Sequence, residues 1–228
     1  MEVPRASRKV GFKALGVLIS FDNQFCCELE ARIASAWRGF YKFYDILCCR
    51  SAPIKKRLSL LAMVVHPALF WCAGSWNLTQ VQLAKLRKAQ HAMIRKMLSP
   101  QRLEGENVPD FMRRSTTCIN NIMCRHGAES RDCKYHRLQF TWAGHLARLV
   151  AYDADRLTYK TFSYKNWAWI SKMSEQFNGR QQHCRKLRTW RWERPMYRFD
   201  PDWQKIARDK QQWLKALNKM VLWRSTAR

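Results

Sequence analysis

The sequence predicts a mainly α-helical protein that begins with a short β-strand or hairpin. Beyond about residue 24, apolar residues recur at intervals of three and four positions, which is the spacing of amphipathic helices. The 228 residues include only eight glycines and seven prolines, so few positions interrupt a helix. Apolar residues make up 47% of the chain and aromatic residues 13%, which suits a folded domain with a buried core rather than a disordered basic tail.

The N-terminal part of the sequence is expected to form one or two short strands followed by two helices. Residues 9–20 place β-branched and aromatic side chains among glycines, which is typical of one or two short strands. A first helix is expected over about 24–49, with Arg38 and Lys42 opposite its apolar stripe. A second helix is expected over about 54–73, bent at Pro67 because proline lacks a backbone N–H. The stripe of the first helix consists of Leu29, Ile33, Ala36, Trp37, Phe40, Tyr44 and Leu47.

A third helix is expected from about residue 79 to Ser99-Pro100. Thr79 and Gln82 have the spacing of a capping box, in which each side chain binds the other residue's backbone N–H. On this helix Lys88 and Arg95 lie opposite the apolar stripe, with Lys85 and Lys96 at its edge. The stripe consists of Leu83, Leu86, Gln90, Met93, Ile94 and Met97.

Residues 100–109 are polar and turn-rich, and they predict an internal boundary. Helices near 109–125 and 129–150 follow, and residues 153–200 have few clear periods. A last helix is expected with Asp200 as its cap and Pro201 in its first position. Its apolar face consists of Trp203, Ile206, Ala207, Leu214, Leu217 and Val221. The expected organisation is a strand segment (1–20), a helical bundle (21–100) and a helical basic region (101–228).

The charge of the chain indicates a polyanionic partner. Lys and Arg number 42 against 17 Asp and Glu, a formal net charge of +25, and nucleic acid is the commonest partner for such an excess. The densest basic segment, 180–194, interleaves cations with tryptophans that can stack on unpaired bases. A basic solvated face with both tryptophans in the core is the alternative interpretation. The candidate contacts in this segment are Arg185, Lys186, Arg188, Trp190, Arg191 and Trp192.

Nine cysteines, an odd number with two adjacent pairs, do not form the pattern of a disulfide framework. The N-terminus lacks the apolar core of a signal peptide. We therefore expect a reducing compartment, nuclear or cytoplasmic rather than secreted. The apolar run 58–73 is shorter than the ~20 residues that cross a membrane and contains His66-Pro67, so a buried helix is expected and no membrane partner.

Motifs for common catalytic chemistries are absent from the sequence. It has no phosphate-binding GxxxxGK[ST] or GxGxxG loop, no GxSxG, no HExxH and no Asp-Asp dipeptide. We expect no cofactor and no small-molecule substrate. Weak zinc candidates are Cys124, His126, Cys133 and His136, but only the last two have a ligand-like spacing, and buried thiols on two helices are the simpler interpretation.

Seven segments of the chain occur in a characteristic order and spacing: 12–17 (FKALGV), 31–43, 66–70 with Gly74 and Trp76, 78–98, 136–149, 185–193 (RKLRTWRWE) and 202–213. Taken together, they resemble the C-terminal part of non-LTR (LINE-like) retrotransposon reverse transcriptases. Each motif alone has little specificity, and the order and spacing together carry the resemblance. FKALGV resembles a strand near the end of the polymerase palm, and RKLRTWRWE lacks the Gly-Arg-Pro of the family pattern.

The resemblance implies a palm-edge remnant at 1–20, a thumb at 21–100 and a post-thumb region at 101–228. A thumb holds the backbone of the template–primer duplex, so RNA and DNA are the expected partners, bound without sequence preference. The palm acids of the family match no position here, so the chain is not expected to be an enzyme on its own, although the family is an RNA-directed DNA polymerase. The candidate thumb contacts are Arg38, Lys42, Lys85, Lys88, Arg95 and Lys96.

Two other hypotheses remain open at this point. One is a basic helical nucleic-acid-binding or scaffold protein unrelated to retrotransposons. The other is a decayed element copy without a function, with which the missing Gly-Arg-Pro and the unusual cysteines are compatible.

Overall fold

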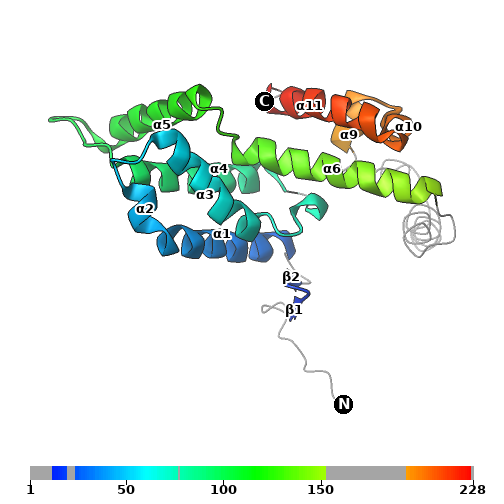
Figure 1. Ribbon diagram of the computed structural model, residues 1–228, viewed down its shortest axis with the longest axis horizontal. Helices are drawn as coiled ribbons and strands as arrows, with labels where there is room; N and C mark the ends of the chain where they lie inside the picture. Colours follow the sequence, from blue (N-terminus) through cyan, green and yellow to red (C-terminus); the bar gives the residue numbers. More distant parts are fainter. Residues whose placement is uncertain (1–11, 20–23, 77, 153–193, 227–228) are drawn as a thin grey trace, which may run out of the picture. The chain divides into compact units, whose positions relative to one another are not determined.

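The computed structural model describes residues 12–19, 24–76, 78–152 and 194–226, and its fold is mainly α-helical, as the sequence predicts (Figure 1). The chain divides into two compact units, Met1–Tyr135 and His136–Arg228, and one helix crosses the boundary between them. The first unit holds β1 (Phe12–Ala14), β2 (Val17–Ile19), α1 (Gln24–Lys42), α2 (Tyr44–Cys48), α3 (Ile54–Leu69), the 3-10 turn η1 (Ala73–Ser75), α4 (Gln80–Leu98), α5 (Val108–Arg125) and the start of α6 (Arg131–Tyr152). The second unit holds the rest of α6 with α9 (Arg194–Phe199), α10 (Trp203–Arg208) and α11 (Lys210–Thr226).

The two strands form an antiparallel hairpin. Phe12 pairs with Ile19 and Ala14 with Val17, leaving a two-residue turn at Leu15 and Gly16. Both turn residues have positive φ, 49° and 81°, as a type I′ turn requires. The expectation of one or two short strands in 9–20 is therefore met by two strands.

A buried carboxylate attaches the hairpin to α1. Glu28 is 2% exposed and accepts a hydrogen bond from the Leu18 backbone N–H at 2.6 Å. It also accepts one from Arg32 Nε at 2.6 Å, and Arg32 Nη2 donates to the Gly16 carbonyl. Glu28 is thus both hydrogen-bonded and charge-paired, which is the condition under which a buried carboxylate is tolerated.

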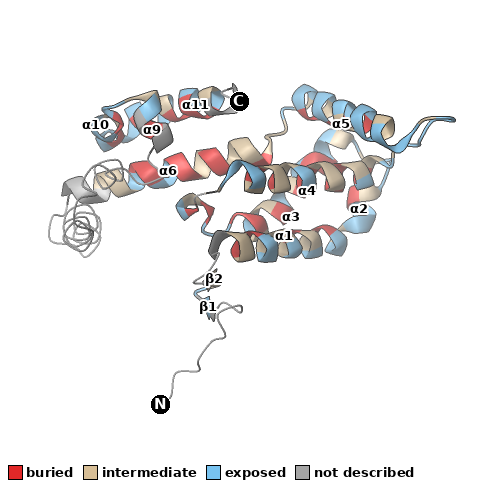
Figure 2. Cartoon of the chain, turned by 180° about the vertical axis from the view of Figure 1, so that it is seen from behind, coloured by how far each residue is buried: buried red, intermediate tan, exposed pale blue. Residues whose placement is uncertain are grey.

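The core of the first unit lies among α1, α3 and α4, where buried residues face inward (Figure 2). α1 packs closely on α3, because a Cβ built on Gly39 would lie 3.0 Å from the Val64 carbonyl oxygen. Pro67 lies within α3, as expected, and the helix ends at Leu69. The expected stripes supply most of this core, including Leu29, Ala36, Phe40, Leu47, Leu83, Leu86, Met93, Ile94 and Met97.

The buried side chain of Arg57 connects the segment before α3 with the C-terminal ends of α2 and α4. Its side chain donates to the backbone carbonyls of Ala52 at 3.1 Å, Leu47 at 3.3 Å and Met97 at 3.0 Å. Leu47 and Met97 lie in the last turns of α2 and α4, where carbonyls lack helical partners and the helix dipole is negative. A buried cation at this point satisfies those carbonyls.

α4 begins with the capping box that the sequence predicts. The Gln82 backbone N–H donates to Thr79 Oγ1 at 3.3 Å, and the Thr79 N–H donates to Gln82 Oε1 at 2.8 Å. The helix ends at Ser99, which has the left-handed φ of 42°. Both ends of this helix follow the sequence prediction.

In the second unit α6 and α11 pack closely. Trp213 is 2% exposed, and its Nε1 donates to the Phe140 carbonyl at 3.1 Å. A Cβ on Gly144 would lie 2.1 Å from Trp213 Nε1, so only glycine leaves room for the indole. Arg148 donates to the Ala207 carbonyl at 2.8 Å, which attaches α10 to the same helix.

The single last helix expected from the sequence is two helices, α10 and α11. Asp209 interrupts it, because its carboxylate accepts from the backbone N–H groups of Gln211 at 2.7 Å and Gln212 at 3.1 Å and so starts a new helix. The break changes the buried face: Leu214, expected in the core, is 52% exposed, and Trp213 is buried instead. Pro201 lies in a turn before α10, not in its first position.

No helix within the described ranges is long and apolar enough to cross a membrane. The run 58–73 forms α3 and the turn after it, with Leu58, Leu61, Val65 and Leu69 buried. The segment 100–109 joins α4 to α5 inside the first unit.

Candidate nucleic-acid interface

α1 and α4 run side by side in the same direction. Lys85 of α4 pairs with Glu30 of α1, with Nζ and Oε1 2.7 Å apart. Three turns further along both helices, the Lys96 Nζ lies 5.7 Å from the centroid of the Tyr41 ring. Both contacts join residues 55 positions apart, so the two helices keep the same register over this length.

Three aromatic rings form a stacked row on the exposed side of α1 and the start of α2. Trp37 stacks on Tyr41 with ring centroids 5.6 Å apart, and Tyr41 stacks on Tyr44 at 6.0 Å. The planes are inclined by only 28° and 27°. Tyr41 is 53% exposed and Tyr44 38% exposed, so two of these rings present area to solvent. We call Trp37, Tyr41 and Tyr44 the aromatic row.

Cations lie near the aromatic row on both helices. On α1, Arg38 and Lys42 are exposed and four residues apart, so they share one side of the helix next to Tyr41. On α4, Lys88 and Lys96 are exposed, and Lys88 lies about one turn after Lys85. Lys96 lies against the Tyr41 ring, whereas the Lys42 Nζ lies 5.9 Å from the centroid of the Phe43 ring. We define the α1–α4 face as the aromatic row with Arg38, Lys42, Lys88 and Lys96.

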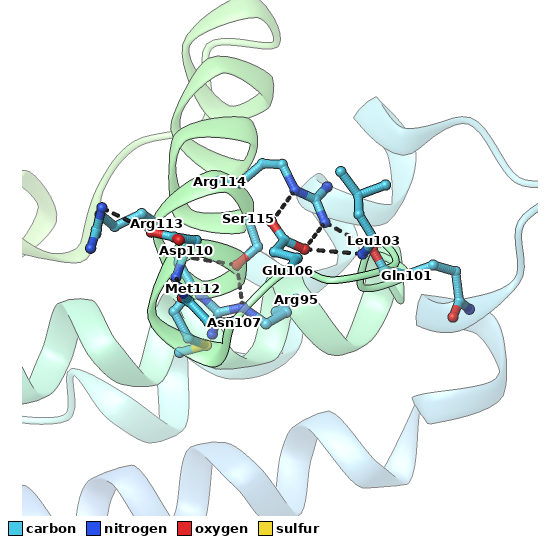
Figure 3. A network of polar contacts seen from close by, with 10 residues as sticks. All are labelled: Arg95, Gln101, Leu103, Glu106, Asn107, Asp110, Met112, Arg113, Arg114 and Ser115. Carbon is cyan, nitrogen blue, oxygen red and sulfur yellow. Dashed lines mark hydrogen bonds and ion pairs between the residues drawn. The ribbon is translucent and has the colours of Figure 1, made fainter.

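Two of the six predicted thumb cations bind side chains of other helices, and a third, Arg38, donates to Ser35 Oγ at 2.7 Å on its own helix. Lys85 forms the ion pair with Glu30, and its hydrogen bond lowers the pKa of the Glu30 carboxyl. Arg95 is half-buried and donates to Ser115 Oγ at 2.9 Å (Figure 3). It also donates to Thr116 Oγ1 at 3.1 Å. Arg95 thus attaches α5 to α4, and it lies two turns after Lys88 on the same side of α4.

Glu106, in the loop before α5, is paired with Arg114 of α5, as Figure 3 shows. Glu106 accepts two hydrogen bonds from Arg114, from Nε and Nη2, each at 2.8 Å, and a third from the Leu103 N–H at 3.0 Å. This arginine lowers the pKa of Glu106 to about 2. Asn107 caps α5 by accepting from the Asp110 N–H at 2.9 Å. These contacts have a structural explanation and leave the α1–α4 face as the candidate interface.

The remaining predicted site residues fall in two groups. Arg185, Lys186, Arg188, Trp190, Arg191 and Trp192 lie outside the described residues. The weak zinc candidates are described: Cys124 is exposed, His126 and Cys133 are half-buried and His136 is buried. Within the described part of the chain, no three His, Cys, Asp or Glu side chains are grouped so that they could hold a metal ion.

Sequence reasoning missed Tyr41 and placed Trp37 and Tyr44 in the core stripe, whereas Trp37 is half-buried and Tyr44 is exposed. The single helix expected over 24–49 is broken at Phe43 into α1 and α2, and Phe40 and Leu47 of the same stripe are fully buried. The spacing of Trp37, Tyr41 and Tyr44, four and then three residues, is the signal that could have found the row, since side chains at these intervals lie on one side of a helix.

No protein-family model, no curated protein and no solved structure matches this chain.

Proposed function

We propose that the chain binds nucleic acid through the α1–α4 face and that it corresponds to the palm-edge, thumb and post-thumb part of a non-LTR retrotransposon reverse transcriptase, without the catalytic acids of the palm. One observation carries the proposal: the aromatic row, with Lys96 of α4 against its Tyr41 ring, shares α1 with the exposed cations Arg38 and Lys42. Charge alone would suit any polyanion, whereas exposed stacked rings beside cations suit a ligand with phosphates and flat bases.

The arrangement favours contact with a backbone over readout of base edges. Lys42, Lys88 and Lys96 are long, exposed side chains on two rigid parallel helices, and their ammonium groups can reach phosphates without a fixed geometry. Such contacts hold a strand in place but carry no sequence information. The proposed function is therefore to hold template and primer, not to select a sequence.

The proposed role is not catalytic. Two-metal phosphoryl transfer needs several carboxylates that converge on divalent ions. Three of the described acids near the α1–α4 face and α5, Glu30, Glu106 and Asp110, are paired with Lys85, Arg114 and Arg113. Asp45, next to Tyr44 at the start of α2, is a single exposed carboxylate and does not make a cluster of metal ligands. If the chain acts in DNA synthesis, the chemistry has to come from another polypeptide segment.

The test is a binding titration of the purified 228-residue chain. The ligands are a labelled RNA–DNA primer–template, a single-stranded RNA and heparin, each from 50 to 200 mM salt, with circular dichroism on the same sample. The proposal expects a preference for the primer–template over heparin and a steep loss of affinity with salt. Equal binding of all three ligands would support the unrelated basic scaffold instead, and an aggregating chain without preference would support a decayed copy.

A further inference from the structure

The first unit contains a cavity of about 300 Å³ on the side of α3 and α4 next to the loop that joins α5 to α6. Leu58, Leu61, Ala62 and Ile94 give it an apolar wall. Its polar lining includes Lys55, Ser59, Gln90 and Arg131. It shares no residue with the α1–α4 face, so the proposed function does not account for it.

Arg131 is the unusual residue of this cavity. It is 1% exposed, and its Nε and Nη1 are buried without a hydrogen-bond partner. Its Nη2 contacts only the Met93 Sδ, at 2.9 Å, and a thioether is a weak acceptor. Within the described ranges Arg131 forms no ion pair, and burial lowers its pKa to about 9, so it stays charged at pH 7.

A buried, uncompensated guanidinium is energetically costly, and such groups are normally paired with a carboxylate or hydrogen-bonded. The backbone around Arg131 is satisfied: its N–H donates to Gln90 Oε1 at 2.9 Å, and Gln90 Nε2 donates to the Glu129 carbonyl at 3.2 Å. The unfavourable free energy of burial therefore comes from the charged guanidinium of Arg131 and not from its backbone. A ligand that supplies negative charge beside the guanidinium would remove that cost.

The charges around the cavity favour an anion. Arg131 and Lys55 are its cationic lining residues and Glu129 its one acidic lining residue. Burial of His66, which also lines the cavity, together with the nearby charges of Arg131 and Lys134, lowers its pKa to about 4, so this imidazole is neutral at pH 7. Arg131 is also the first residue of the 22-residue helix α6, whose N-terminus carries partial positive charge.

We propose that this cavity binds a small organic oxyanion with an apolar body, a phosphate monoester or an aromatic carboxylate, held by Arg131 and Lys55. The guanidinium is closed to water in this structure, so binding includes a rotation of the Arg131 side chain away from Met93. The apolar wall takes the body of the ligand, and Lys55, which is exposed, holds the oxyanion from the outer side. The volume admits a ring-sized molecule with one oxyanion but no polymer.

Thermal unfolding of the full chain tests this proposal. The probes are inorganic phosphate, phenyl phosphate and benzoate, each compared with sodium chloride at the same ionic strength. A ligand that binds only the folded chain raises its melting temperature with concentration. We expect phenyl phosphate or benzoate to raise it more than inorganic phosphate does, because the apolar wall then contributes, and the comparison of the two identifies the preferred oxyanion.

Variants separate the cavity from the strongly basic surface. Arg131→Met removes the buried charge at similar volume, so we expect a melting temperature without ligand at least equal to that of the unchanged chain, and no rise with either organic anion. Lys55→Met should raise, at least threefold, the ligand concentration at which the rise in melting temperature is half-maximal. Lys56→Met, an exposed neighbour that does not line the cavity, should leave it unchanged. If the rise persists in Arg131→Met, or if Lys55→Met and Lys56→Met respond alike, the anions bind the surface and the proposal is wrong.

Discussion

The ammonium group of Lys96 lies 5.7 Å from the centroid of the Tyr41 ring, across the junction between α4 and α1. A cation over an aromatic face is attracted by the ring quadrupole, by about 0.5–1 kcal/mol at an exposed site. The contact holds Lys96 next to a ring that is itself half open to solvent. One lysine and one tyrosine from two helices thus bring a cation and an exposed aromatic ring together, the two kinds of group on which the proposed nucleic-acid binding depends.

Tyr41→Ala tests the aromatic row. We expect the affinity for single-stranded RNA and for the unpaired template end to fall by about 1–3 kcal/mol per lost stacked base, and the affinity for blunt duplex to change less. Ile46→Ala, an exposed apolar residue on α2 outside the row, is the control. Fluorescence anisotropy with the three ligands gives the comparison. Equal losses for all ligands in both variants would remove the row from the interface.

Thr79→Ala tests the capping box at the start of α4. The change leaves the Gln82 N–H without its side-chain acceptor, and we expect the free energy of unfolding to decrease by about 1 kcal/mol. Val81→Ala, 71% exposed in the same turn, should leave stability nearly unchanged. Urea unfolding followed by circular dichroism measures both. A loss in Val81→Ala as large as that in Thr79→Ala would show that the cap contributes nothing.

Gly144→Ala tests the close approach of α6 and α11. The added methyl group would lie 2.1 Å from Trp213 Nε1, so the indole has to move and its bond to the Phe140 carbonyl is strained or lost. Overpacking of this kind costs typically about 1–3 kcal/mol. Thr141→Ala, exposed on the same helix, is the control. Unfolding followed by tryptophan fluorescence should show the loss in Gly144→Ala alone, and an unchanged midpoint there would contradict this packing.

His66→Gln tests the pH dependence of stability. The folded state holds the pKa of His66 at about 4, below the usual 6.5, because the ring is largely desolvated and Arg131 and Lys134 lie near it. The unfolded chain therefore binds this proton more readily, and the free energy of unfolding decreases as the pH falls from about 6.5 toward 4. At about 1.4 kcal/mol per pKa unit, the decrease is on the order of 2–3 kcal/mol.

The measurement is a series of urea unfolding curves between pH 4.5 and 7 in phosphate-free buffer. His91, whose pKa burial also lowers, adds a decrease of the same sign in both proteins. The His66→Gln variant should lose only the part due to His66 and so show a flatter pH profile. Parallel profiles for the two proteins would mean that His66 is not buried in its neutral form.

Most helix positions of the first unit follow from the sequence because their signals are local, but the single helix expected over 24–49 is two helices, α1 and α2, and α3 ends at Leu69 rather than at 73. The capping box of Thr79 and Gln82, the apolar stripes and Pro67 within α3 depend on residues a few positions apart. The single last helix was a wrong prediction, since Asp209 can either continue a helix or cap the next one. The packing of Trp213 against Gly144 decides between these, and that contact joins residues far apart in the sequence.

The candidate interface was only partly predictable. Exposure of Arg38, Lys42, Lys88 and Lys96 follows from helix periodicity, and the structure agrees with it. A helical wheel does not show which other helices pack against α4, so it could not show that Arg95 binds Ser115 on α5. Nor could it show that α1 and α4 are parallel neighbours, which is what places lysines beside the aromatic row.

The most direct test of the central claim is the salt dependence of primer–template binding by the Lys88→Glu/Lys96→Glu variant. Its matched control is Arg102→Glu/Arg125→Glu, exposed residues of α5 and the preceding loop, and both variants lower the net charge from +25 by four to +21. Losing two phosphate contacts should reduce the slope of log K against log salt by about 1.8, while the control keeps the slope of the unchanged chain. Equal reductions in both variants would show that binding depends on total charge and not on the α1–α4 face.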